Sequence, residues 1–205
     1  MGQIAKKLTD KGYKVDGVSP SPVFAQQARD LLPKESEIFE CFYEQLETSK
    51  QYDLVLFSES FQYIKPDKAI EKSLTLLKPE GHILICDIFK VDIEEKSPLS
   101  GGHNLTSFLE TVSGYPISLL NEIDITDKTA PNMDIENQIF QDVIRPVSGL
   151  VGELLDNRHP MIYRILKWKY KKKIEKMRLK YFSDQRTAEN FKKFKSYRLL
   201  LYKRK

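Results

Sequence analysis

The chain has 205 residues, of which 40% are hydrophobic and 30% are charged. This composition excludes a disordered chain, and the length allows one α/β domain with a small appended element. The longest apolar run is far shorter than the roughly 20 residues of a membrane-spanning helix, and the first residues contain no apolar signal segment. Two cysteines provide neither a disulfide framework nor a paired metal motif, so we expect a cytoplasmic protein.

The net charge of +4 conceals two parts of opposite sign. Residues 160–205 contain seventeen Lys and Arg residues against three acidic residues, which gives a net charge of +14. Residues 1–159 carry a net charge of −10. The basic character of the protein therefore belongs to the last quarter of the chain, where any attraction to an anionic partner would arise.

The first half of the chain alternates between helical and strand patterns. In chain order, the hydrophobic spacing and the Gly and Pro positions predict a helix over 4–11, a strand over 13–18, a helix over 22–32, strands over 38–42 and 52–57, a helix over 66–77, a turn over 78–81 and a strand over 82–87. Strands separated by helices of about ten residues predict a largely parallel, doubly wound sheet.

The second half is less regular. The patterns predict a loop over 88–104, a helix over 105–112, a strand over 118–125, a helix over 134–155 that is broken near Pro146 and Gly149, a long basic helix over 161–182, a short helix over 187–194 and a final strand over 197–202. This gives an α/β fold with a helical segment inserted before the last strand.

Three segments carry a resemblance to a known family. Their sequences are GQIAKKLTDKGYKVDGVSPSP (residues 2–22), YDLVLFSES (residues 52–60) and LKPEGHILI (residues 77–85). In this order and spacing they resemble the small-molecule class I S-adenosylmethionine-dependent methyltransferases, over roughly residues 1–90. The resemblance implies a Rossmann-like doubly wound sheet that is mostly parallel, with an antiparallel last strand. Residues 1–130 would then form the cofactor-binding core, 131–195 a helical insertion or lid, and 196–205 the last strand.

The family places its central first strand and the first two glycines of a GxGxG loop before Gly2, which matches the last glycine of that loop. Met1 would stand at the variable position of that loop, so we expect Met1 to be an internal methionine and the first strand to be missing. The segments 13–18 and 52–57 would then have open pairing edges, and we expect the chain to be poorly stable or inactive alone. The DNA upstream of Met1 tests this expectation, which fails if no in-frame strand and glycine sequence lies there.

The resemblance also implies a set of cofactor-binding residues. Ser19 stands where the family usually has an acidic residue that binds the ribose, and a serine lacks the charge-assisted pair of hydrogen bonds. The alternative is that Ser19 and Pro20 only form a turn. Phe42 and Tyr43 would pack on adenine, unless both rings fill the core. The full set of candidates is Gly2, Ser19, Pro20, Phe42, Tyr43, Glu44 and Ser58.

Methyl transfer from a sulfonium requires the donor and acceptor atoms to be aligned, and it needs a general base only if the acceptor loses a proton. The candidates for this role are Glu59, Tyr63 and His103. A lone histidine in a mobile-looking loop is more often a solvated bystander, which is the alternative for His103. We expect no metal, because no His, Cys and Asp cluster has metal-ligand spacing.

The expected substrate is a small metabolite or a lipid-like acceptor. For the basic segment 160–182 three interpretations are open: a lid whose charges are solvated, a helix that docks on an anionic membrane surface, or an RNA-binding element. RNA ranks last because the final strand ties the tail into the sheet. Two alternative functions are a non-catalytic, degenerate relative that has lost cofactor binding and a membrane- or RNA-associated methyltransferase.

Overall fold

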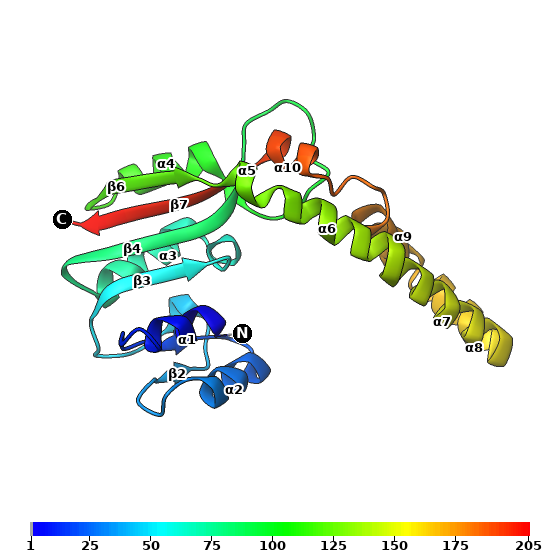
Figure 1. Cartoon of the computed structure of the whole chain (residues 1–205), viewed down its shortest axis with the longest axis horizontal. Coiled ribbons are helices and arrows are strands. Elements are labelled where there is room, and N and C mark those ends of the chain that lie inside the picture. The colour runs from blue at the N-terminus through cyan, green and yellow to red at the C-terminus, as the bar shows by residue number, and fades with distance from the viewer. Residues whose placement is uncertain (1) are drawn as a thin grey trace.

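The computed structural model describes residues 2–205, so the expectation for Met1 lies outside the described residues. The main sheet has the strand order β3-β4-β7-β6, and β5 pairs with β4. A second, two-stranded sheet consists of β1 and β2 (Figure 1). The strands are β1 (Gly17–Val18), β2 (Ile38–Phe39), β3 (Tyr52–Ser58), β4 (Leu77–Lys90), β5 (His103–Asn104), β6 (Ile117–Asp124) and β7 (Lys195–Arg204).

The sheet is mixed, and its last strand is antiparallel, as expected from the sequence. Strand β4 pairs in parallel with β3 and β5, whereas β7 runs antiparallel to both of its neighbours, β4 and β6. The register places Tyr197 of β7 opposite Ile88 of β4. Because β7 runs in the opposite direction, its first residues lie at the edge where β3 and β4 end.

Helix α1 (Gln3–Thr9) precedes β1, and α2 (Pro22–Leu31), α3 (Pro66–Leu76) and α4 (Leu105–Ser113) connect successive strands. Local sequence explains two of their starts. The Ser21 hydroxyl accepts a hydrogen bond from the Phe24 amide, and the Asn104 side chain accepts one from the Ser107 amide, so both residues act as N-caps.

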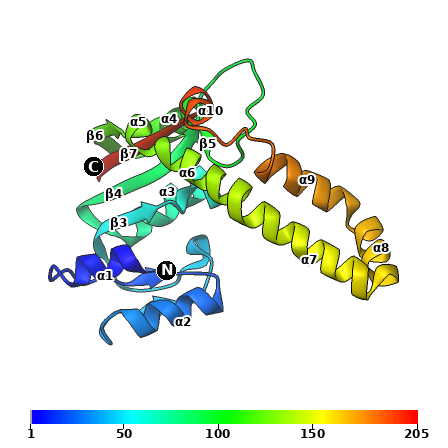
Figure 2. The ribbon, with the colours of Figure 1, turned by 45° about the vertical axis from the view of Figure 1, so that its right-hand side comes forward.

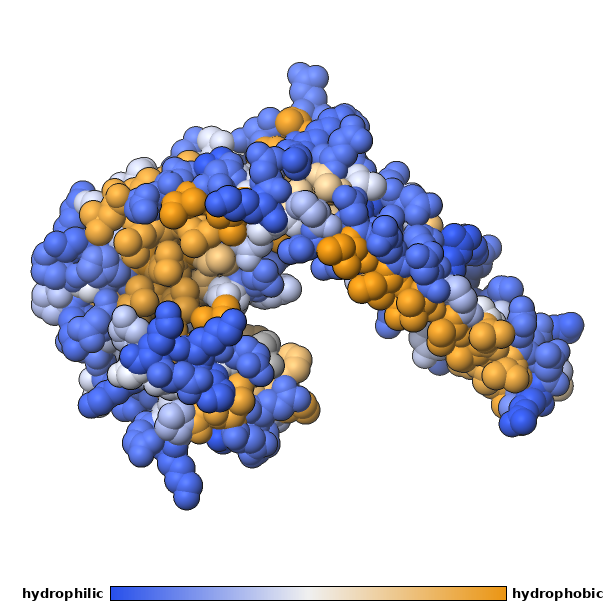
Figure 3. Space-filling view, viewed as in Figure 1, coloured by the Kyte–Doolittle hydropathy of each residue, from blue (hydrophilic) through white to orange (hydrophobic). Residues whose placement is uncertain are grey.

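One face of the main sheet carries the core. Phe61 lies at its centre with no exposed surface, and its ring meets those of Phe57 and Phe108 edge to face at 5.3 Å. Helices α3 and α4 contribute further apolar side chains to the same cluster. The opposite face is only partly covered, since Leu54 remains 43% exposed and an apolar area is visible on the body of the molecule (Figure 3).

A helical hairpin projects from the body, and we call residues 131–182 the arm (Figures 1 and 2). Its first limb runs from α6 (Pro131–Ile139) through a π-helical turn at Phe140–Ile144 into α7 (Arg145–Arg158). Its second limb comprises α8 (Pro160–Lys169) and α9 (Lys171–Tyr181). The short helices α5 (Thr126–Thr129) and α10 (Ala188–Phe194) flank the base of the arm, and η1 (Tyr43–Gln45) and η2 (Phe61–Tyr63) are single 3₁₀ turns.

The arm has one of the two predicted breaks in its first limb. The limb is irregular at the π-helical turn Phe140–Ile144, which ends two residues before Pro146, whereas Gly149 lies within α7. A proline ring clashes with the carbonyl four residues earlier, here Asp142 in that turn. The predicted long helix over 161–182 is two helices that meet at Tyr170, whose φ of −104° and ψ of 12° depart from helical geometry.

The strand lengths differ from prediction at both ends of the fold. Strands β1 and β2 pair over only two residues each, so most of the residues predicted as strands over 13–18 and 38–42 lie outside them. Strand β4 is longer than predicted and includes the expected turn at 78–81, where Glu80 adopts a left-handed φ of 63°. The predicted loop over 88–104 shrinks because β4 continues to Lys90 and His103 and Asn104 form β5.

Candidate functional site

The candidate site lies at one edge of the sheets. The parallel strands β1, β2, β3 and β4 all end there, and β7 begins there, so polar residues from distant parts of the chain converge. In open α/β sheets the carboxyl ends of the strands form the usual ligand crevice. The geometry at this edge therefore decides what the protein can bind.

The predicted adenine-binding pair separates into one exposed ring and one core ring. Phe42 follows β2 and is 55% exposed. Tyr43 instead packs edge to face on Phe57 at 5.0 Å, and its hydroxyl forms a 2.8 Å hydrogen bond with the Ser73 hydroxyl. Burial raises the pKa of Tyr43. Glu44 is exposed in the 3₁₀ turn that follows, so only Phe42 offers a free aromatic surface at this end of β2.

Ser19 stands directly after β1, as predicted. Its amide donates to the Phe39 carbonyl at 2.9 Å, and its hydroxyl accepts from the Ser21 amide at 3.3 Å. This second bond closes a local turn, as expected if Ser19 and Pro20 only form a turn. The Ser19 hydroxyl can still donate a hydrogen bond to a ligand. Pro20 is exposed, and Ser58 is half-buried at the end of β3.

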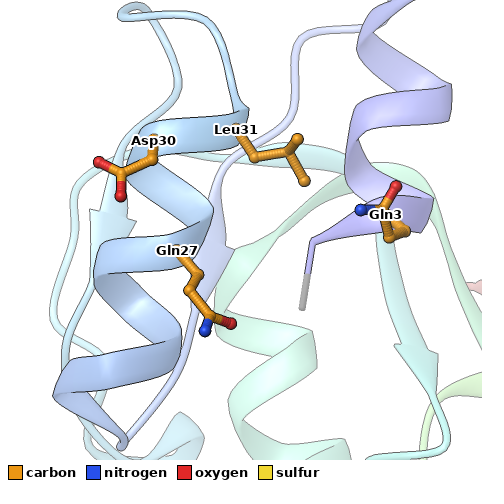
Figure 4. Close-up of a pocket in the computed structure, with 4 residues that line it drawn as sticks. All are labelled: Gln3, Gln27, Asp30 and Leu31. Atoms are coloured by element: carbon orange, nitrogen blue, oxygen red, sulfur yellow. The ribbon is translucent and has the colours of Figure 1, made fainter.

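Gly2 does not lie beside Ser19. It adopts a left-handed φ of 82° as the N-cap of α1, and a Cβ added there would meet Ala28 and Leu31 of α2. Ser19 comes just before the first residue of α2, Pro22. At a rise of about 1.5 Å per residue, Ala28 lies roughly 9 Å further along the helix from Pro22, so Gly2 meets a different part of α2. A shallow hollow of about 300 Å³ separates the start of α1 from α2; Figure 4 shows its lining, which is Gln3, Gln27, Asp30 and Leu31.

Of the predicted general-base candidates, Glu59 is the best placed. It follows β3 with a left-handed φ of 53°, which a non-glycine residue rarely adopts, so the turn presents its side chain at the sheet edge. The hydroxyl of Tyr197 on β7 donates to Glu59 Oε1 at 2.7 Å. Burial raises the pKa of Tyr197, and the bond to the carboxylate acts in the same direction.

Tyr63 and His103 have different surroundings. Tyr63 is 82% exposed and is free to meet a ligand. The His103 ring is half-buried, and its Nε2 lies 3.2 Å from the Phe61 carbonyl and 2.8 Å from the Ile64 carbonyl. Because both partners are acceptors, we assign the proton to Nε2, and this nitrogen is occupied in holding the turn after β3. His103 is therefore not the solvated loop residue of the alternative interpretation.

A buried polar network lies behind Glu59, and the sequence analysis missed it. The Asp87 carboxylate is 1% exposed and accepts from the Gln62 amide at 3.1 Å, from Gln62 Nε2 at 3.2 Å and from the Ile88 amide at 2.7 Å. Burial raises the pKa of Asp87, and the backbone hydrogen bonds oppose this effect. The Gln62 side chain also accepts from the Gly102 amide at 3.2 Å, so the network fixes the loop that precedes β5.

Lys195 is a second buried charged residue at this edge. It is 2% exposed, its ammonium donates to the Gly101 carbonyl, and burial lowers its pKa to about 8. It lines an open hollow of about 420 Å³ with residues of β6, β7 and α10, which include Asp124, Ser196 and Arg198. The Arg198 guanidinium bonds to Glu122 and Asp124 across the two strands, so this hollow has paired charges.

No sequence signal marked Tyr197 or Lys195 as site residues. Both lie on the final strand, and only the antiparallel register with β4 brings them to the end of β3. Asp87 is the last residue of the predicted strand over 82–87, but its partner Gln62 comes from a separate turn. Tyr197 is 138 residues away from its partner Glu59 in the sequence, so only the folded structure shows that the two side chains meet.

Two further observations concern the described residues 2–205. Within that range no group of three or more His, Cys, Asp and Glu side chains has a geometry that could hold a metal ion. Among the same residues no helix is long and apolar enough to cross a membrane. Both cysteines have free thiols, and the Cys86 thiol lies 3.7 Å from the Tyr197 hydroxyl.

Comparisons with known proteins find similarity to methyltransferases. The family model described as a methyltransferase domain matches residues 1–85. An uncharacterized methyltransferase from Bacillus thuringiensis (strain Al Hakam) is 29% identical over 119 residues, which are 54% of this chain and 56% of that relative. The chain thus spans little more than half the length of the curated relative that it matches.

Solved structures with low sequence identity share the fold. A cyclopropane synthase from Mycobacterium tuberculosis matches 99% of this chain and 74% of its own, with a TM-score of 0.67 at 13% identity. The geranyl diphosphate C-methyltransferase of Streptomyces coelicolor, solved with Mg²⁺, geranyl diphosphate and S-adenosyl-L-homocysteine, matches 100% of this chain and 67% of its own, with a TM-score of 0.66 at 12% identity. Residues 1–85 therefore match the methyltransferase-domain model, and the chain shares the fold of these solved structures.

Proposed function

We propose that this chain is the larger part of an S-adenosylmethionine-dependent methyltransferase that acts on a small metabolite or a lipid-like acceptor. The observation that carries the proposal is the family match over residues 1–85, which includes the ends of β1, β2 and β3 where the candidate ligand residues lie. The acceptor class rests on the names of structural neighbours such as the geranyl diphosphate C-methyltransferase. Residues 1–130 with 196–205 form the proposed catalytic unit, and 131–195 form its helical insertion.

The residues present fit a bound S-adenosylmethionine on one side of its site. The exposed Phe42 ring would pack on the adenine, the Ser19 hydroxyl would bind the ribose, and Ser58 would face the methionine part. The cofactor itself supplies the methyl group and its reactivity. Gly2, the proposed glycine of the cofactor site, lies beside Ala28 and Leu31 and not beside Ser19. The described residues therefore do not bring this glycine to the other proposed cofactor-binding residues.

A gap between the two sheets supports a further element of the proposal. Among the described residues β1 pairs only with β2, and β3 pairs only with β4. Helix α1 buries none of its residues, although Ile4, Ala5 and Leu8 lie at helical spacing. We propose that a strand from outside residues 2–205 pairs between β1 and β3 and draws α1 and Gly2 toward Ser19.

The proposed roles at the acceptor side follow from the Glu59–Tyr197 pair. Glu59 would receive the proton of an acceptor that must lose one, and the Tyr197 hydroxyl would hold the carboxylate in position. Tyr63, which is largely exposed, would contact the acceptor. The network from Asp87 through Gln62 to Gly102 would keep the nearby loop fixed while the donor and acceptor atoms align.

The test is an assay of S-adenosylhomocysteine formation by a protein that contains this chain together with the proposed strand. The acceptors are a panel of small carboxylic acids, amines, phenols and prenyl diphosphates. The proposal expects release of S-adenosylhomocysteine with at least one class and a large loss of turnover in Glu59→Gln if that acceptor loses a proton. Cofactor binding without turnover on any class would leave the second candidate function, a methyltransferase-like binding protein. The substitution of the expected acidic residue by Ser19 is the observation that favours this second candidate.

A further inference from the structure

The outer face of helix α8 has a surface that the proposed function does not use. Met161, Ile165 and Trp168 are 77%, 58% and 82% exposed, which is unusual for three large apolar side chains on one short helix. We define them as the apolar patch. Within the described residues the patch lies in the second limb of the arm, which projects away from the sheets (Figures 1 and 2).

The helix geometry shows that the patch faces away from the first limb. The Tyr163 hydroxyl lies 3.6 Å from the position that a Cβ on Gly152 would take, so Tyr163 faces α7. At about 100° per residue, Met161, Ile165 and Trp168 lie roughly 140–160° around α8 from Tyr163. The patch is therefore on the opposite side of the helix from the contact that holds the hairpin together.

Basic side chains surround this patch. At about 100° per residue, Arg164 and Lys169 lie on its two sides, roughly 100–120° from Tyr163. Residues 160–182 contain nine Lys and Arg residues against Glu175, a net charge of +8. The run Lys171–Lys173 begins the next helix, directly beyond the patch. The surface thus combines an apolar centre that contains a tryptophan with a cationic rim.

We propose that this surface docks on an anionic phospholipid membrane, with Met161, Ile165 and Trp168 inserted at the headgroup level and the basic residues on the lipid phosphates. An interfacial helix requires this combination: apolar and aromatic side chains to enter the boundary and cations to attract anionic lipid. Met161 and Ile165 have no hydrogen-bonding group with which to recognise a nucleic acid. The inference does not require cofactor binding, so it can fail or hold independently of the proposed methyltransferase function.

The first limb of the arm provides a matched control surface. Val147, Val151 and Leu154 of α7 are 53%, 50% and 58% exposed, and Figure 3 shows an apolar stripe along the arm. Residues 131–158 carry five acidic against two basic residues, a net charge of −3. An anionic membrane repels such a limb, so its apolar residues should contribute little to binding.

Trp168 is the only tryptophan of the chain, and it reports directly on the patch. The experiment titrates the whole chain with vesicles of phosphatidylcholine alone and of phosphatidylcholine with about one-third phosphatidylglycerol, and it records tryptophan fluorescence and co-sedimentation. We expect a blue shift and binding with the anionic vesicles only. Bromine-labelled lipid should quench the fluorescence, and raised salt should weaken the binding.

Three variants decide the outcome. The double substitution Met161→Ser with Ile165→Ser keeps the reporter and should lower the partition coefficient at least tenfold, as should Lys171→Gln with Lys172→Gln and Lys173→Gln. The control triple substitution Val147→Ser, Val151→Ser and Leu154→Ser should leave it within about twofold. Circular dichroism confirms that each variant keeps its helices.

Four results would overturn the inference. The first is equal binding to neutral and anionic vesicles, and the second is a loss of binding in the control variant alone. The third is saturable binding of a short RNA without vesicle binding, which would assign the surface to nucleic acid. The fourth is self-association that the patch variant abolishes in the absence of lipid affinity, which would assign it to a second copy of the chain.

Discussion

Replacement of Asp87 tests whether the buried network behind Glu59 holds the candidate site together. The carboxylate is 1% exposed and accepts the backbone amides of Gln62 and Ile88. In Asp87→Ala both amides lose this acceptor, at about 1–3 kcal/mol each, so the expected loss in the free energy of unfolding is about 2–6 kcal/mol. Asp87→Asn keeps an acceptor oxygen for one of the two amides and turns its NH2 group toward the other, so it should lose about 1–3 kcal/mol, less than the alanine variant.

The stability difference between the wild type and Asp87→Asn should also depend on pH. Burial raises the pKa of Asp87 above its ordinary value of 3.8, so the folded state favours the protonated carboxyl. The wild type should therefore lose stability relative to Asp87→Asn as the pH rises from about 4 toward neutrality. Urea unfolding followed by circular dichroism measures both effects. An alanine variant as stable as the asparagine variant, or a pH-independent difference between wild type and Asp87→Asn, would refute the reasoning.

Four other predictions follow from the same structure. Phe61→Ala should lower the free energy of unfolding by about 3–5 kcal/mol in denaturant titrations, because the ring is fully buried at the centre of the core. Gly102→Ala should lower the melting temperature, since φ is 77° there and a Cβ would lie 2.6 Å from the Ile88 carbonyl oxygen; an unchanged melting temperature would contradict this geometry. Lys195 has its pKa lowered to about 8 from 10.5, so the wild type should gain stability as the pH rises between these values, because the folded protein has released a proton that the unfolded chain still holds. Lys195→Met should remove that gain, and a parallel pH profile of the two proteins would count against it. Tyr197→Phe should lower turnover in the acceptor assay and leave cofactor affinity unchanged, which separates positioning of Glu59 from binding.

Much of the fold could be predicted because its signals are local. The buried strand at Tyr52–Ser58 and the strand around Ile83 and Ile85 are near-continuous apolar runs, and the prolines at the starts of α2 and α3 mark those helices. The antiparallel last strand followed from the family resemblance and is confirmed by the pairing of β7 with β4. The extents of β1 and β2 could not be predicted, because strand length depends on which neighbours pair.

The site was predictable only where a residue follows a strand. Glu59 and Ser58 were found in this way, and both lie at the sheet edge. Tyr197 was missed, because its contact with Glu59 depends on the register of two strands far apart in sequence. For Tyr43 the core alternative holds, since packing on Phe57 depends on the turn at Tyr43–Gln45 and not on the residue type.

We expect this chain to bind S-adenosylmethionine once a strand pairs between β1 and β3. Calorimetric titration of the 205-residue chain and of the same chain extended by its upstream coding sequence, each with S-adenosylmethionine, tests it most directly. We expect saturable binding by the extended protein, in the range of about 1 μM to 1 mM that is usual for enzyme substrates, and weak or absent binding by the 205-residue chain. No binding by the extended protein at about 1 mM cofactor, or equally tight binding by both proteins, would contradict it.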